Sequence, residues 1–280
     1  IIKTKCWRYF RYDKPNKKLA KEMTDYSKPL ILNNIAWWIN NVSDRYIVIW
    51  FCGVAANGIY SVAYKIPSIL TMFQTIFNQA WTLSAVKEFD EKNSEFYINI
   101  YNIYNIGMVV VCSGLIIFNK VIAKILFANE FYRAWEYAPF LMISVVFGAL
   151  SSVLGGIFTA TKQSKLIGQT TVIGAVINII LNIILVYGMG PVGAAIATMI
   201  SYAVVWIIRI KYVKKIIPFS VKNRINNLSY IILLIQAILM IVIRNIIITT
   251  FLELLGFLII IILYYKELKI ILGKIVTKLK

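Results

Sequence analysis

Stretches of apolar residues long enough to cross a membrane recur along almost the whole chain. A hydrocarbon core about 30 Å thick requires roughly 20 consecutive apolar residues in a helix. Stretches that approach or exceed this length span residues 29–52, 59–84, 98–119, 135–160, 166–188, 191–210, 226–243 and 246–265. We therefore predict an all-α fold, a polytopic membrane bundle of about eight transmembrane helices.

The composition agrees with this prediction and excludes a soluble domain. Apolar side chains make up 60% of the 280 residues and charged ones 15%. Soluble domains are about 45–50% apolar and about 25% charged, so this chain has too little polar surface to coat a soluble core. One boundary stays open. Only Arg244 separates the last two stretches, and a single long helix is the alternative there.

The excess of basic residues, a formal net charge of +18, follows the predicted topology. If the N-terminus is cytoplasmic, the inner segments hold 24 of the 30 Lys and Arg residues and the outer connections hold four. Inner connections of membrane proteins carry such an excess. We therefore predict a multi-pass protein with an even number of spans and both ends cytoplasmic. The charge indicates topology, and we expect no nucleic-acid partner.

The chain has few residues suited to catalysis or metal binding. It contains no histidine, and its three cysteines, Cys6, Cys52 and Cys112, form no CxxC pair. Catalysis by histidine is therefore impossible, and the pattern argues against a zinc finger or a disulfide framework. We predict no metal, no cofactor and no enzymatic activity.

Polar residues inside membrane spans are costly, so their arrangement carries the clearest functional signal. In the first predicted span they recur at i, i+4, i+7 and i+11, a spacing that places them on one face of a helix. A second set repeats this spacing one residue later and widens the stripe. The two sets are Asn33, Trp37, Asn40 and Asp44, and Asn34, Trp38, Asn41 and Arg45.

The second predicted span also has a polar face, and the Gly53–Gly58 run joins it to the first span. We expect the two helices to form an antiparallel hairpin whose polar faces line one water-filled cavity. Pro67 is predicted to kink the second helix beside Lys65, a position suited to a gate. The polar face carries Ser61, Lys65, Ser68, Thr75 and Gln79, with Asn78 beside it.

The charged residues of this hairpin admit two compatible interpretations. In the structural one, Asp44 pairs with Lys65 or Arg45 and locks the two helices together. In the functional one, Arg45 and Lys65 bind a phosphate or pyrophosphate, because Arg offers a planar fork of donors and Lys a point charge. The surrounding Asn, Gln and Trp side chains suit a sugar. Asn178 and Asn182 are secondary candidates, which either line the cavity or join two helices.

Three runs near the N-terminus form a distinctive set of motifs: WWINNVSDRY at 37–46, GIYSVAYKIP at 58–67 and QAW at 79–81. A less specific GxxGAAxAT pattern follows at 190–198. With these runs, residues 29–88 resemble the first two helices of the C-terminal lobe of bacterial polysaccharide (O-antigen-type) flippases, which belong to the multidrug/oligosaccharidyl-lipid/polysaccharide exporter superfamily. The resemblance covers nearly the whole chain.

The resemblance implies an alternating-access transporter of 12 or 14 spans, with two six-helix lobes around a central cavity. Residues 1–28 would be a basic, aromatic cytoplasmic linker at the membrane interface. Residues 29–210 would be the C-terminal lobe, and 211–280 two additional helices with a basic cytoplasmic tail. The N-terminal lobe of the same protein would then be a missing partner, and the lipid bilayer the surroundings.

The resemblance also implies a substrate and a location. Members of the family flip a polyprenyl-diphosphate-linked oligosaccharide, such as an O-antigen repeat unit of lipopolysaccharide or a capsule unit, across the bacterial inner membrane. Arg45 and Lys65 would then contact the diphosphate or acidic sugars, while Asp44 would orient or neutralise them.

Three other functions remain open. A multidrug/cation antiporter of the same superfamily would place unpaired carboxylates in its cavity, where this chain has two cations and one acid. A lipid II-type flippase is a closer alternative. A membrane-bound polysaccharide polymerase or transferase belongs to a different class. An acyltransferase would normally need histidine, and a polymerase would carry long charged outer loops, which the sequence lacks.

Overall fold

The computed structural model describes residues 16–87, 94–221, 223–243, 245–270 and 273. Over these residues the chain forms a bundle of helices without strands, which confirms the predicted fold class. The elements are α1 (Lys17–Ala63), α2 (Ser68–Lys87), α3 (Ser94–Leu126), the 3-10 helix η2 (Asn129–Glu136), α4 (Ala138–Ala160), α5 (Ser164–Met189), α6 (Pro191–Ile216), α7 (Asn223–Val242) and α8 (Ile246–Leu263).

Seven helices in the described part of the chain are long and apolar enough to cross a membrane. They are α1 and the helices from α3 to α8, so the chain is a multi-pass membrane protein. The remaining α-helix, α2, is not among these seven. It has 20 residues but carries several amides and hydroxyls, as expected for a helix with one polar face.

The second predicted span is interrupted rather than kinked. Gly53 adopts φ +85°, a conformation open to glycine, and the chain reverses there directly after the first span. Residues 54–63 are helical, residues 64–67 form turns, and α2 then begins at Ser68. Pro67 disfavours helical backbone in the residue before it, which explains a break at this position. The glycine-rich connection is therefore shorter than predicted, whereas the distortion at Pro67 is larger.

The first span begins earlier than predicted. α1 starts at Lys17, where Asn16 caps it by accepting a hydrogen bond from the backbone N–H of Lys18 at 3.0 Å. Residues 17–28 of the predicted linker are thus continuous with the first helix, while residues 1–15 lie outside the described residues. Pro29 lies inside α1 and packs closely on α5, since a Cβ on Gly168 would be 2.6 Å from the Pro29 carbonyl oxygen.

The last apolar run forms two helices, so the single-helix alternative is wrong. α7 ends at Val242 and α8 begins at Ile246, after Asn245. The Asn245 side chain caps α8 by accepting from the backbone N–H of Ile247 at 3.0 Å. Arg244, which the sequence places at this break, lies outside the described residues.

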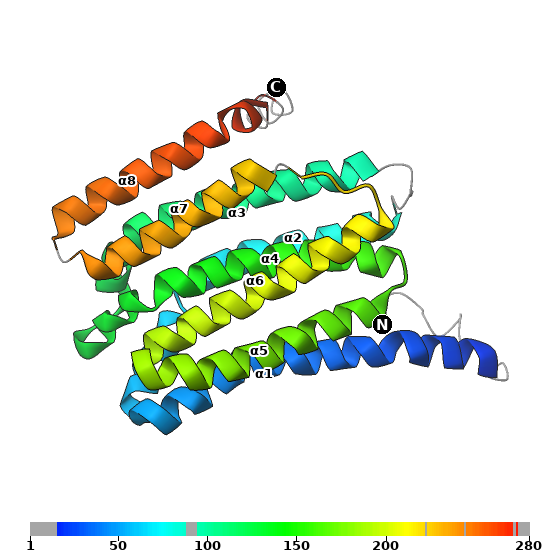
Figure 1. Cartoon of the computed structure of the whole chain (residues 1–280), viewed down its shortest axis with the longest axis horizontal. Coiled ribbons are helices and arrows are strands. Elements are labelled where there is room, and N and C mark those ends of the chain that lie inside the picture. Colours follow the sequence, from blue (N-terminus) through cyan, green and yellow to red (C-terminus); the bar gives the residue numbers. More distant parts are fainter. Residues whose placement is uncertain (1–15, 88–93, 222, 244, 271–272, 274–280) are drawn as a thin grey trace, which may run out of the picture.

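Helices far apart in sequence lie side by side in the bundle (Figure 1). α1 and α5 form one side, α4 and α6 lie in the middle, and α8 lies on the opposite side. Gly190, which joins α5 to α6, lies beside Cys52 at the break in α1. The connection between α4 and α5 lies at the opposite end of the bundle from the one between α5 and α6 (Figure 1). This alternation agrees with the predicted topology, while the orientation in the cell stays a prediction.

Cysteine labelling tests the predicted orientation. In full-length protein without its native cysteines, Met189→Cys and Asn57→Cys should react with a membrane-impermeant maleimide on intact cells. Lys162→Cys should react only after permeabilisation, because it lies at the opposite end of the bundle. Labelling in the reverse pattern would show that the termini are not cytoplasmic.

Candidate functional site

The two polar sets of α1 face different surroundings. The first set, Asn33, Trp37, Asn40 and Asp44, turns inward: Asn40 and Asp44 are fully buried, and the other two are half-buried. The second set turns outward, and all of its side chains are exposed. The two sets therefore do not form one widened stripe. The exposed residues are Asn34, Trp38, Asn41 and Arg45.

Side-chain hydrogen bonds join the inward set to α5 along both helices. Such bonds hold membrane helices together, because no water competes for the polar groups. Thr171 donates to Asn33 at 2.6 Å, Ser43 donates to Asn178 at 3.1 Å, and Asn182 donates to Asp44 at 2.8 Å. Sequence numbers rise together in all three pairs, so α1 and α5 run parallel. Asn178 and Asn182 thus join two helices, one of their two predicted roles.

Asp44 is the best-connected side chain of this contact. Its carboxylate is fully buried and accepts hydrogen bonds from four neutral donors. The predicted ion pair with Arg45 or Lys65 does not form, because neither cation lies within 4.0 Å of a described acidic group. The donors are Tyr60 at 3.2 Å, Tyr64 at 3.2 Å, Thr198 at 2.5 Å and Asn182 at 2.8 Å.

Arg45 and Lys65 are exposed, and Arg45 lies next to the ring of Tyr64, which binds Asp44. The Arg45 guanidinium carbon is 5.7 Å from the centroid of the Tyr64 ring, and Lys65 follows Tyr64 in the chain. The Tyr64 hydroxyl donates to Asp44. Tyr64, at the break in the second span, thus contacts the buried acid through its hydroxyl and the exposed Arg45 through its ring, and the exposed Lys65 is the next residue in the chain.

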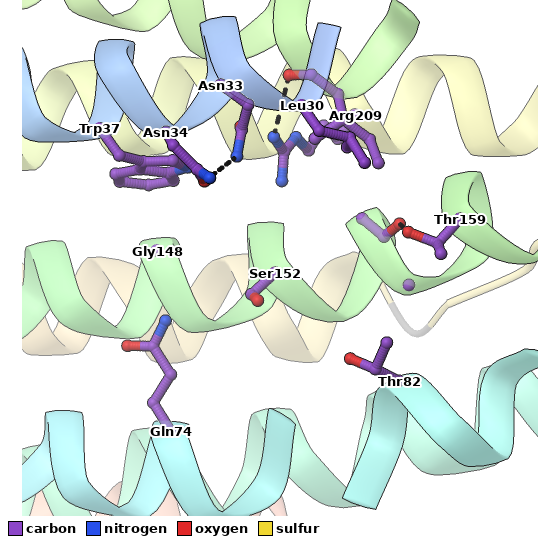
Figure 2. Close-up of a pocket in the computed structure, with 13 residues that line it drawn as sticks. Leu30, Asn33, Asn34, Trp37, Gln74, Thr82, Gly148, Ser152, Thr159 and Arg209 are labelled. Atoms are coloured by element: carbon purple, nitrogen blue, oxygen red, sulfur yellow. Dashed lines mark hydrogen bonds between the residues drawn. The ribbon is translucent and has the colours of Figure 1, made fainter. Parts of the chain in front are cut away.

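A cavity of about 460 Å³ lies between α1, α2, α4, α5 and α6 (Figure 2). Among the predicted site residues, Asn33 and Trp37 line it, and Asn34 of the outward set reaches its edge. Figure 2 shows their side chains and Arg209 on one side, with Gln74 and Thr82 of α2 across from them. The other polar side chains on the lining are the hydroxyls of Ser152 and Thr159.

Arg209 is a candidate that the sequence reasoning missed. It is one of the 24 basic residues that the predicted topology assigns to inner segments, but the structure buries it in the bundle with 2% of its surface exposed. The signal that was overlooked is its spacing on α6: Thr198, Tyr202 and Arg209 follow i, i+4 and i+11 and share a face. A Cβ on Gly155 would be 3.2 Å from Arg209 Nη1, so the glycine leaves the guanidinium room.

The guanidinium of Arg209 contacts only uncharged acceptors in the described residues. It donates to the Thr170 hydroxyl at 3.0 Å, the Ser151 carbonyl at 2.7 Å, the Ile167 carbonyl at 3.3 Å and the Thr171 hydroxyl at 2.9 Å. These bonds satisfy most of its donors but leave its charge without an anion. A buried unneutralised cation favours an anionic group beside it.

The lining of the cavity fits a polar ligand better than a metal. Amides, hydroxyls and an indole beside one cation suit a sugar that carries, or is attached to, an anionic group. In the described part of the chain, no three acidic or Cys side chains gather where they would hold a metal ion. The cavity lining can therefore bind and orient such a ligand.

The remaining predicted residues lie outside the cavity. Asn40 is buried, and its amide has no hydrogen-bond partner among the described residues. Asn41 accepts a hydrogen bond from the Tyr202 hydroxyl at 3.1 Å. Gln79 is exposed on α2, and Asn78 beside it is half-buried. The hairpin thus does not gather all predicted residues around one cavity.

Comparison with known families supports the resemblance noted in the sequence. A family described as "Polysaccharide biosynthesis protein" matches residues 7–136, the part of the chain that ends with η2. A probable low-salt glycan biosynthesis flippase, Agl15 of Haloferax volcanii, is 28% identical over 78% of this chain and 46% of its own length. The chain thus spans about half the length of this curated relative.

Two solved transporters share the fold. The lipid II flippase MurJ, in an inward closed conformation, matches 93% of this chain and 57% of its own chain, with a TM-score of 0.65 and 19% identity. The MATE transporter VcmN of Vibrio cholerae matches 80% of this chain and 54% of its own, with a TM-score of 0.65 and 19% identity. At this identity the two structures establish the fold alone.

Removing the Asp44 carboxylate should destabilise the bundle. Asp44→Ala leaves four donors without their acceptor, and we expect the free energy of unfolding to fall by about 3 kcal/mol. Asp44→Asn keeps the shape and one acceptor, so its loss should be smaller. Thermal unfolding of purified protein measures both effects. Glu22→Ala, an exposed acid on the same helix, is the control, and an equal effect there would refute a special role for Asp44.

Proposed function

We propose that this chain, which is of the polysaccharide flippase type, forms one lobe of a transporter for lipid-linked oligosaccharides. A second lobe, outside this sequence, would complete the central cavity, and alternating access would carry the glycan head group across the membrane. The chain's length relative to Agl15 supports this division, because the chain covers 46% of that protein.

The observation that carries the proposal is a polar and cationic surface on helices of membrane-spanning length. Asn34, Asn41 and Arg45 on α1 are exposed, as are Lys65 in the turn before α2 and Gln79 on α2 itself. Lipid is a poor neighbour for these groups, because polar side chains in hydrocarbon need partners or water. Such a surface is what one half of a water-filled pathway would present.

The charges of this surface suit a diphosphate. Arg45 lies over the Tyr64 ring and Lys65 follows Tyr64 in the chain, and neither cation is neutralised by a described acidic group. We assign them to the diphosphate that links the glycan to a polyprenyl chain, which would stay in the surrounding lipid. The sugars would then reach the cavity, where Trp37 and the amides of Asn33 and Gln74 are available.

The break at residues 64–67 gives the pathway a point of bending. Helical segments on both sides of Pro67 can change their relative angle without breaking a continuous ladder of backbone hydrogen bonds. Because Lys65 is within this turn, a change of angle would move the cation toward or away from the pathway. We assign Pro67 to the gate on these grounds.

The biological setting follows from the same proposal. The substrate would be an O-antigen, capsule or similar repeat unit, and the membrane would be the bacterial inner membrane with both ends of this chain in the cytoplasm. The activity would be transport and not catalysis. A cation antiporter is less favoured, because the cavity and exposed surface present cations while the one acid nearby, Asp44, is fully buried.

Loss of the two cations should abolish export while leaving the protein in the membrane. In cells that depend on the full-length protein, Arg45→Ala or Lys65→Ala should lower surface glycan at least about tenfold, since charged hydrogen bonds contribute roughly 1.5–3 kcal/mol. Lipid-linked glycan should accumulate in the inner leaflet. Surface glycan is measured by gel staining and normalised to the amount of membrane-inserted protein.

A matched control separates this role from a general effect of charge. Arg133→Ala removes an exposed arginine near the same end of the bundle, in the connection that η2 forms. It should leave export unchanged. Wild-type levels of surface glycan in both the Arg45 and Lys65 variants would overturn the assignment of the diphosphate to these residues.

A further inference from the structure

A second large cavity, a groove of about 750 Å³, lies where α1, α5 and the end of α6 meet. Its walls are largely apolar and include Leu32, Val172 and Ile173, which are 55%, 40% and 43% exposed. The close contact between Pro29 and Gly168 forms part of its lining. Apolar side chains open to the surroundings on spanning helices are the normal neighbours of hydrocarbon chains.

The groove is separate from the cavity of the proposed transport pathway. Leu30 and Asn33 of α1 line that cavity, whereas Leu32 lines the groove, so the two hollows use different faces of the same helix. On α5, Ile167 belongs to the cavity and Gly168 to the groove. The contact between α1 and α5 therefore lies between them.

Basic side chains surround the groove at the end of the bundle where α1 and α5 begin. Lys28 of α1 and Lys165 of α5 both line it and are exposed, and Tyr212 of α6 closes one side. A neighbouring hollow of about 490 Å³ shares Tyr212 and adds three more lysines, Lys211, Lys214 and Lys215. The acid on the lining is Asp25, which lies 3.9 Å from Lys28.

We propose that this groove binds an anionic glycerophospholipid of the leaflet next to the basic end of the bundle. Its phosphate would lie between Lys28 and Lys165, and an acyl or isoprenoid chain would lie along Leu32, Val172 and Ile173. Lysine is a common phosphate ligand, and tyrosine favours the level of the headgroups. The five lysines outweigh Asp25, so the site selects an anionic headgroup over a zwitterionic one.

The bound lipid would have a structural consequence for the lobe. The groove lies over the contact between α1 and α5, next to Thr170, whose hydroxyl accepts from Arg209 at 3.0 Å. A lipid there would exclude water from the outer side of these hydrogen bonds and keep the two helices together. We therefore expect lipid binding to raise the thermal stability of the protein, in addition to being selective for an anionic headgroup.

Native mass spectrometry of the purified full-length protein tests the proposal. Phosphatidylglycerol should bind more tightly than phosphatidylcholine and should raise the unfolding temperature. Lys28→Gln/Lys165→Gln should reduce the preference for phosphatidylglycerol about 25-fold, since each of the two charges contributes roughly fivefold near an anionic surface. Water-soluble glycerol phosphate should bind far more weakly, because it lacks the hydrocarbon chain.

The control is Lys17→Gln/Lys18→Gln, which removes two exposed charges from the start of α1, outside the groove. It should retain the wild-type lipid preference. An equal loss in this control would show diffuse attraction and overturn the site. A wild-type preference in the Lys28/Lys165 variant, or equally tight binding of glycerol phosphate, would also overturn it. Surface glycan export reports separately on the proposed transport function.

Discussion

The hydrogen bonds at the buried Asp44 carboxylate join three helices of the lobe, α1, α5 and α6. One buried acid on α1 accepts from Tyr60 and Tyr64 after the reversal at Gly53, from Asn182 on α5 and from Thr198 on α6. In hydrocarbon an ionised or polar group without partners is expensive, so these contacts are strongly constrained. They fix where the second span folds back and how α5 and α6 pack on α1.

Arg209 is a buried cation that, like the buried Asp44, is hydrogen-bonded by neutral groups. Its guanidinium is held by hydroxyls and carbonyls of α4 and α5, and described residues supply no carboxylate to neutralise it. The bundle thus keeps Asp44 and Arg209 apart, each hydrogen-bonded by neutral groups. Because hydrogen bonds fix the position of the guanidinium but do not cancel its charge, the adjoining cavity remains attractive to anions.

Because Asp44 is hydrogen-bonded by neutral groups, Arg45 and Lys65 keep their charges available for a ligand. If Asp44 had paired with either cation, the exposed surface would have lost much of its positive charge. The structure instead separates a buried framework, centred on Asp44, from an exposed cationic face beside Tyr64. This separation links the proposed transport function to the packing of the lobe, because a polar face on spanning helices needs a partner lobe or water to cover it.

Sequence alone was enough to predict the helical membrane fold and the alternating ends of the bundle. Long apolar stretches and the distribution of Lys and Arg are local properties, so no tertiary information was needed. The sequence also identified Asp44, Arg45 and Lys65 as unusual, and it predicted a connection at residues 53–58 and a kink at Pro67, where the structure has a break. Which side chains meet depends on the tertiary packing. Helical spacing shows which residues share a face but not which neighbour that face meets. It therefore did not predict the partners of Asp44, the burial of Arg209 or the separation of the two polar sets of α1.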